Sequence, residues 1–144
     1  MTDKGKDRLY LSVVFTIFVA GYITYWLPSC AGGNRWKLSR TIQSGRGILS
    51  NLEAYRQKFG NYPAGDSEAI MRALNGNNPV HWHAPPPPIA STNQAGIWLD
   101  EWGKAYEVRT DPLLVKSAGP NGKFGDKDDI VVDWKMLTAS NKIP

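Results

Sequence analysis

The apolar and polar positions of the chain divide it into three zones, and the first zone is almost uniformly apolar. Leu9–Leu27, LYLSVVFTIFVAGYITYWL, carries no charge over about 19 residues, close to the length that spans a bilayer as a helix. Aromatic rings that favour a membrane interface lie near its two ends: Tyr10, Tyr22, Tyr25 and Trp26. The pattern predicts a membrane anchor. Basic residues precede and follow it, so charge does not settle its orientation.

The second zone has a helical period. Ile42, Leu49, Leu52 and Phe59 recur at spacings that place them on one stripe of an amphipathic helix. Leu38, Ile48 and Tyr55 lie beside the stripe, and the opposite side carries Arg40, Gln43, Ser50, Asn51 and Lys58. Gly60 and Pro63 are expected to end this helix. Two internal glycines, Gly45 and Gly47, each weaken it by about 1 kcal/mol relative to alanine, so it depends on packing.

A second, short helix is predicted over DSEAIMRALNG. Asp66 or Ser67 caps it, an apolar face follows, and Gly76 ends it: the face consists of Ile70, Met71 and Leu74. The next segment, NNPVHWHAPPPPIASTNQAG, reads as a loop, because four consecutive prolines favour an extended path. His81 and His83 have no third ligand nearby, so we expect them half-buried with Trp82 rather than binding a metal.

The third zone, from Ile97 onward, has the pattern of short strands. IWLDEWGKAYEVR places the turn DEWG between two strands, and LLVKSAG and IVVDWKM are two more. We expect Trp102 of the turn to be buried against the first helix near Leu52 or Tyr55. Helices followed by hairpin-connected strands predict an α+β unit in which an amphipathic helix packs on a small antiparallel sheet. The expected division is residues 1–33, tail and anchor, and residues 34–144, globular domain.

Composition and charge argue against nucleic-acid binding, and the single cysteine adds an alternative to the intact membrane anchor. The 144 residues carry a net charge of +4 with a pI of about 9.2, yet no basic run is interleaved with aromatic residues, so nucleic-acid binding is not expected. The one cysteine, Cys30, lies in LPSCA, which resembles a bacterial lipobox and leaves lipidation as an alternative to an intact anchor. Ser117 with a histidine and an aspartate suggests a hydrolase only weakly, because no Gly-x-Ser-x-Gly elbow exists. We expect no enzyme and no small-molecule substrate.

The acid of this basic chain is concentrated in SAGPNGKFGDKDDI. Asp126, Asp128 and Asp129 supply carboxylates and Asn121 an amide oxygen, which are ligands of the kind that calcium takes. Glycines let the backbone turn so that carbonyls face one point. A plain glycine-rich turn with surface acid is the alternative. The calcium interpretation is favoured because crowded aspartates repel one another without a cation, and because a small domain gains from a metal.

Three stretches resemble the major pseudopilin of the type II secretion system, within the type IV pilin-like proteins. NLEAYRQKFGNYP looks like the end of that family's first helix, and LDEWGKAYEV looks like its Asp-Pro-Trp-Gly-x-Pro-Tyr segment. SAGPNGKFGDKDDI is similar to its Ser-x-Gly-Pro-Asp-Gly…Asp-Asp-Ile loop. By this match Asn121 stands at the position of a family Asp, Asp128 matches a side-chain ligand, and Asp129 is the neighbouring acid. Ala118 and Lys123 would supply carbonyls, and Asp126 adds further acid.

The resemblance implies a single-pass subunit of the bacterial inner membrane, with its C-terminal domain on the periplasmic side. It implies partners among other pseudopilin subunits or secretion-apparatus proteins, bound calcium and no enzymatic activity. One feature departs from the family: Gly5 in KGKDRLYLSVVF is not followed by Phe-Thr-x-x-Glu, where the family's leader is cut. A structural subunit or assembly factor is therefore one hypothesis. An unprocessed, membrane-tethered or lipid-anchored binding module that has lost fibre assembly is the other.

Overall fold

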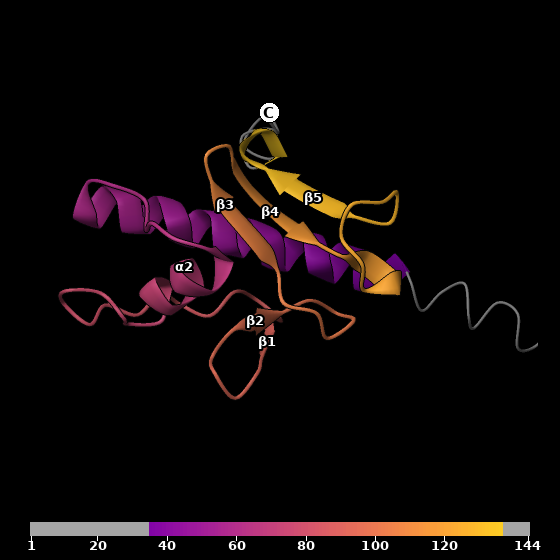
Figure 1. Ribbon diagram of the computed structural model, residues 1–144, viewed down its shortest axis with the longest axis horizontal. Helices are drawn as coiled ribbons and strands as arrows, with labels where there is room; N and C mark the ends of the chain where they lie inside the picture. Colours follow the sequence, from indigo (N-terminus) through magenta and orange to yellow (C-terminus); the bar gives the residue numbers. More distant parts are fainter. Residues whose placement is uncertain (1–34, 137–144) are drawn as a thin grey trace, which may run out of the picture. The chain divides into compact units, whose positions relative to one another are not determined.

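A computed structural model describes residues 35–136 of the chain. The predicted anchor, Cys30 and the boundary at residues 33–34 lie outside these residues. Within residues 35–136, no helix combines the length and the apolar character needed to cross a membrane. The described part consists of one long helix, a short helix α2, a two-stranded sheet and a three-stranded sheet (Figure 1).

The long helix occupies residues 35–59, as the sequence predicts. It ends where the Gly60 N–H donates to the Arg56 carbonyl at 2.8 Å. Ile48, Leu49 and Leu52 are completely buried, which confirms the centre of the predicted stripe. Two assignments were wrong: Leu38 is 41% exposed, whereas Asn51, placed on the polar side, is buried. The buried surface of the helix is therefore rotated away from Leu38 and extends to Asn51.

Helix α2, Ser67–Leu74, confirms the predicted second helix. The Asp66 carboxylate caps it by accepting from the Ala69 N–H at 2.9 Å, and its buried face consists of Ile70, Met71 and Leu74. The Ser67 hydroxyl connects this helix to the sheet: it accepts from the Val108 N–H at 2.9 Å and donates to the Val108 carbonyl at 3.2 Å.

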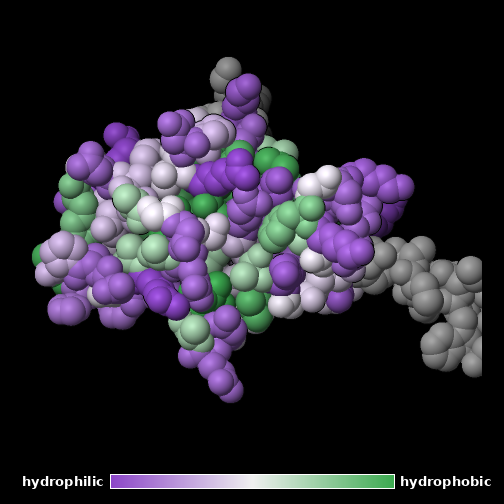
Figure 2. Space-filling view, viewed as in Figure 1, coloured by the Kyte–Doolittle hydropathy of each residue, from purple (hydrophilic) through white to green (hydrophobic). Residues whose placement is uncertain are grey.

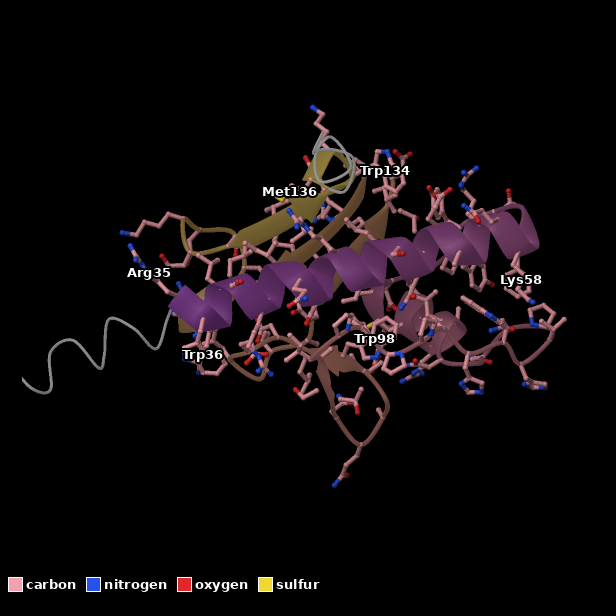
Figure 3. All side chains as sticks on the ribbon, turned by 180° about the vertical axis from the view of Figure 1, so that it is seen from behind. Arg35, Trp36, Lys58, Trp98, Trp134 and Met136 are labelled. Atoms are coloured by element: carbon pink, nitrogen blue, oxygen red, sulfur yellow. The ribbon has the colours of Figure 1, made fainter. Side chains whose placement is uncertain are left out.

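The larger sheet is antiparallel and has the order β3-β4-β5, with β3 Glu107–Thr110, β4 Leu113–Ser117 and β5 Ile130–Asp133. Val108, Val115 and Val132 lie opposite one another across the three strands, and all are buried. The last strand is shorter than predicted, since residues 134–136 continue as helix. Trp134 and Met136 follow the strand and are about two-fifths exposed (Figure 3).

The predicted loop before Ile97 also contains a strand that the sequence analysis missed. Strand β1, Ser91–Thr92, pairs antiparallel with β2, Trp98–Leu99. Strands of two residues are too short to show an alternating pattern, which explains why this strand was not predicted.

The side chains of His81 and His83 are exposed rather than half-buried as the sequence had suggested. Trp82 between them packs at the edges of the Tyr55 and Phe59 rings.

The proline run lies along the long helix and is held by side chains of that helix. The buried Ser44 hydroxyl donates to the Pro88 carbonyl at 2.9 Å, and the Asn51 amide donates to the Pro85 carbonyl at 2.8 Å. These hydrogen bonds satisfy buried polar groups and explain why Asn51 faces inward. We call Pro85–Pro88 the proline strap.

Both helix glycines mark close approaches of other elements. A β-carbon on Gly45 would lie 2.9 Å from Cγ2 of Val132 in β5. A β-carbon on Gly47 would lie 2.9 Å from Cδ of Pro88 and 3.1 Å from Cβ of Pro87. The residues that weaken the helix by propensity therefore allow the sheet and the proline strap to pack directly on its backbone.

The two tryptophans of IWLDEW occupy different environments. Trp98 is 2% exposed and belongs to the core together with the buried helix residues (Figure 3). Trp102 is half-buried, with its ring centroid 5.9 Å from Nζ of Lys37. The prediction that Trp102 packs near Leu52 or Tyr55 was wrong, because the turn lies beside an earlier part of the helix.

Replacement of Gly47 by alanine tests the close approach of the proline strap. Alanine raises helix propensity by about 1 kcal/mol, but overpacking against proline rings and backbone costs about 1–3 kcal/mol. We expect Gly47→Ala to unfold in urea at the parent's midpoint or below it. The matched control is Ser50→Ala, on the exposed side of the same helix, which should stay within about 0.5 kcal/mol of the parent. A clear gain in stability for Gly47→Ala would contradict this packing.

Candidate functional site in the acidic loop and the Asp100 turn

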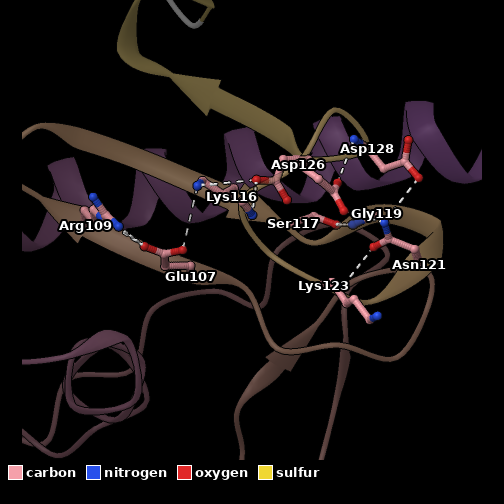
Figure 4. Close-up of polar contacts among 11 residues, drawn as sticks. Glu107, Arg109, Lys116, Ser117, Gly119, Asn121, Lys123, Asp126 and Asp128 are labelled. Atoms are coloured by element: carbon pink, nitrogen blue, oxygen red, sulfur yellow. Dashed lines mark hydrogen bonds and ion pairs between the residues drawn. The ribbon is translucent and has the colours of Figure 1, made fainter.

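The acidic loop, residues 118–129, connects β4 to β5 at one end of the three-stranded sheet (Figure 4). It begins with the 3-10 helix Gly119–Asn121. Gly119 has a φ of +64°, and a β-carbon there would lie 2.1 Å from the Asp128 carbonyl oxygen. The start and the end of the loop are thus in backbone contact at a position that accepts only glycine.

Three of the predicted metal ligands lie together in this loop. The Asn121 amide nitrogen donates to Asp126 Oδ2 at 2.6 Å and to Asp128 Oδ2 at 3.3 Å (Figure 4). The other Asp126 oxygen accepts from the Asp128 N–H at 2.9 Å. That backbone hydrogen bond, followed by the Asn121 amide, lowers the pKa of Asp126, so this exposed carboxyl is held in its charged form.

The Asp129 carboxylate has other partners. Its Oδ2 accepts from the Gly125 N–H at 2.8 Å and lies 3.5 Å from Nζ of Lys116 on β4. The Lys116 ammonium is also 4.0 Å from Glu107, which pairs with Arg109, so charges of alternating sign cross the outer face of the sheet. The second oxygen, Asp129 Oδ1, is buried and accepts no hydrogen bond from any residue in the range 35–136.

The remaining predicted ligands contribute backbone only. Ala118 is completely buried, and Lys123 is exposed, with its N–H donating to the Asn121 amide oxygen at 2.8 Å. Nowhere in the part of the chain that the structure describes do three or more His, Cys, Asp or Glu side chains form a metal-binding group. The loop therefore offers oxygens of the kind that calcium takes, from two carboxylates, one amide and backbone. Ligation by Asn121 requires its amide oxygen to turn toward the two aspartates.

A buried carboxylate that the sequence did not predict, that of Asp100, lies next to this loop. Its Oδ1 accepts from the N–H groups of Trp102 and Lys104 at 3.0 and 2.9 Å. Its Oδ2 accepts from the Ser117 hydroxyl at 2.5 Å, and both residues are at least 97% buried. An Asp that opens a turn commonly bonds the backbone two residues on, which is the one signal the sequence contained. Its partner Ser117 is distant in sequence.

The turn that Asp100 holds, residues 100–104, contacts the long helix through its outer side chains. Glu101 forms an ion pair with Arg40, whose Nε lies 2.9 Å from the carboxylate, and Trp102 lies beneath Lys37. These contacts are partly exposed, and each contributes at most about 1 kcal/mol. These contacts place the turn against the first described turns of the long helix, at Lys37 and Arg40.

Other features give weaker grounds for a site. A shallow hollow of about 340 Å³ lies between the start of α2 and β3, and polar and charged residues form most of its lining. The face in Figure 2 is largely hydrophilic, with separate small apolar areas. Ser117, considered above as a nucleophile, donates its hydroxyl hydrogen to Asp100, so its position is that of a structural group.

Comparison with known proteins supports the fold. No family model matches the sequence, and no curated protein matches it. A search of solved structures finds the crystal structure of the major pseudopilin from the type 2 secretion system of enterohaemorrhagic Escherichia coli. The match has a TM-score of 0.53 and 22% identity, and it covers 79% of this chain and 93% of that chain. The chain therefore has a pseudopilin-like fold, which confirms the resemblance to the major pseudopilin.

Two glycines of the loop provide a matched test of its closure. Gly119 and Gly122 have φ values of +64° and +67°, but a β-carbon on Gly122 would meet nothing within 4 Å. Gly122→Ala should cost only the left-handed conformation, about 1–2 kcal/mol. Gly119→Ala adds a clash with backbone and should cost at least about 2 kcal/mol more in the free energy of unfolding. Equal destabilisation of the two variants would contradict the contact with Asp128.

Proposed function

We propose that the chain is a pseudopilin-like structural subunit or assembly factor of a type II secretion, pilus-like apparatus. The observation that carries this proposal is the fold, a long helix packed on a small antiparallel sheet, matched over 93% of the E. coli major pseudopilin chain. The proposal is supported by the acidic loop and the Asp100 turn, since these two stretches carry the sequence resemblance and lie side by side. Other pseudopilin subunits are the partners that it implies.

In this proposal Leu9–Leu27 anchors the subunit in the bacterial inner membrane, and residues 34–144 face the periplasm. The uncharged length of the segment is the support for the anchor. We expect the full-length chain in the membrane fraction and a fragment starting at Asn34 in the soluble fraction.

Deletion of the gene in a bacterium that secretes through this system should leave exported proteins in the periplasm. The parent chain should restore secretion, and a chain lacking residues 9–27 should not. Unchanged secretion after deletion would overturn the proposed function.

The second candidate is a membrane-tethered binding module that does not polymerise. It is favoured by the residues after Gly5, which are Lys-Asp-Arg rather than Phe-Thr-x-x-Glu. The mass of the N-terminal peptide of membrane-extracted protein separates the cases. Cleavage after Gly5 favours the fibre subunit, an intact Met1 favours the tethered module, and a lipid on Cys30 favours its lipid-anchored form.

We further propose that the acidic loop holds one calcium ion. Asn121, Asp126 and Asp128 would supply side-chain oxygens, and backbone carbonyls such as those of Ala118 and Lys123 would complete the shell. The support is the convergence of these three side chains. Asp129, next to Asp128 in sequence, adds a buried carboxylate oxygen, Oδ1, that accepts no hydrogen bond within the described residues. Its other oxygen, Oδ2, pairs with Lys116. An amide where the family has a carboxylate lowers the negative charge, so we expect a dissociation constant of about 10⁻⁵ to 10⁻³ M.

Calcium should stabilise the fold measurably. At a hundredfold excess over the dissociation constant, binding adds about 2.7 kcal/mol, which raises the melting temperature of a domain of this size by about 10–20 °C. Excess calcium should restore a midpoint lowered by chelator. Magnesium should not, because it requires a tighter octahedron. Asp128→Ala should abolish the response, and Asp111→Ala, an exposed acid in the β3–β4 turn, should retain it. A parent chain indifferent to calcium and chelator would contradict the site.

A further inference from the structure

The acidic loop and the Asp100 turn are joined by a continuous series of hydrogen bonds, of which the two at Ser117 are buried. The Gly119 N–H donates to the Ser117 hydroxyl at 3.0 Å (Figure 4). That hydroxyl donates to Asp100 at 2.5 Å. The other Asp100 oxygen accepts the N–H groups of Trp102 and Lys104. Ser117 uses its single hydroxyl hydrogen on Asp100, and a lone pair of the same oxygen accepts the Gly119 N–H.

Gly119 lies between the loop and this series of hydrogen bonds. On one side its N–H is fixed by Ser117, and on the other its α-carbon lies against the Asp128 carbonyl, without room for a β-carbon. Asp128 in turn shares the Asn121 amide with Asp126. A change that orders Asn121, Asp126 and Asp128 therefore fixes the Asp128 backbone, and with it the direction of the Gly119 N–H toward Ser117.

We propose that the Asp100–Ser117 pair couples the acidic loop to the turn at residues 100–104, so that a cation held by the loop orders that turn. The coupling deepens the calcium site proposed above and rests on it. Ordering of the turn would extend to the long helix, because Glu101 contacts Arg40 and Trp102 contacts Lys37. Calcium in the loop thus stabilises the contact between the turn and the helix. Asp100 and Ser117 are positioning residues in this proposal, since neither supplies a ligand.

The test is amide hydrogen exchange of peptides covering residues 100–104 in the full-length chain, held in detergent micelles, with and without calcium. In the parent, calcium should slow this exchange by roughly tenfold or more. In Ser117→Ala the slowing should disappear. Because coupling is reciprocal, the same variant should bind calcium about tenfold more weakly in a titration. Ser67→Ala is the matched control: it removes another serine that bridges to backbone, at Val108, and should keep the parent response.

Asp100→Asn provides a second variant in case Ser117→Ala does not fold. It keeps an oxygen for the Trp102 and Lys104 N–H groups but presents a donor to Ser117, which orphans the buried hydroxyl hydrogen. Loss of the calcium effect at residues 100–104 in either variant supports the coupling. Slowing equal to the parent's in both variants overturns it and leaves the calcium site standing.

Failure of the parent to bind calcium would instead overturn the proposed site, and the coupling would then be judged without metal. Asn121→Ala releases the loop carboxylates, and Ser117→Ala breaks the series. If the two changes act through it, their combined effect on exchange at residues 100–104 should depart about fivefold or more from the product of the separate effects. A combined effect equal to that product overturns the coupling.

Discussion

The packing of the long helix on two sides through its own backbone is the constraint on which the rest of the fold depends. Because Gly45 has no side chain, Val132 of strand β5 can approach the helix backbone closely. The proline strap approaches it in the same way at Gly47. A side chain at either position would push one element outward and open the core formed by Ile48, Leu49 and Leu52. The low helix propensity of glycine is thus accepted in exchange for close contact, and the helix is stabilised by its neighbours rather than by its own sequence.

Once the long helix, the sheet and the proline strap are packed together, the acidic loop and the Asp100 turn lie side by side at the end of the sheet. Asp100 is withdrawn from water and is satisfied by three donors, two from its own turn and one from the last residue of β4. A buried carboxylate without these donors would be costly, so the burial itself requires Ser117 to be in place. Because Ser117 also receives the Gly119 N–H, the geometry of the acidic loop is fixed by a residue outside that loop.

In the proposed subunit, the helix, the sheet and the Asp100 turn have different roles. The long helix carries the connection to the predicted anchor, the sheet supports the loop, and the Asp100 turn lies between the loop and the helix. A cation in the loop would act on a contact with the helix rather than on a distant surface.

Local patterns determined the elements whose signals are local. The long helix and its end at Gly60, the capped α2 with its apolar face, and the three strands with buried Val108, Val115 and Val132 all follow from period, capping and breakers. The acid-rich loop was also recognisable, since its composition disfavours α-helix and strand. The resemblance to pseudopilins rested on short motifs of the same local kind, and the fold agrees with it.

The tertiary structure alone decided which side of each element is buried and which polar groups meet. A single amphipathic stripe assumes one partner surface, but the helix has two, so Asn51 turned inward and Leu38 outward. Trp98 and Trp102 are equally hydrophobic in sequence, but Trp98 lies in the core and Trp102 is half-buried beside the long helix. The Asp129 carboxylate pairs with Lys116 as well as with the Gly125 N–H of its own loop, because the adjacent strand supplies a cation. These choices depend on residues brought together from distant parts of the chain, and no local pattern records them.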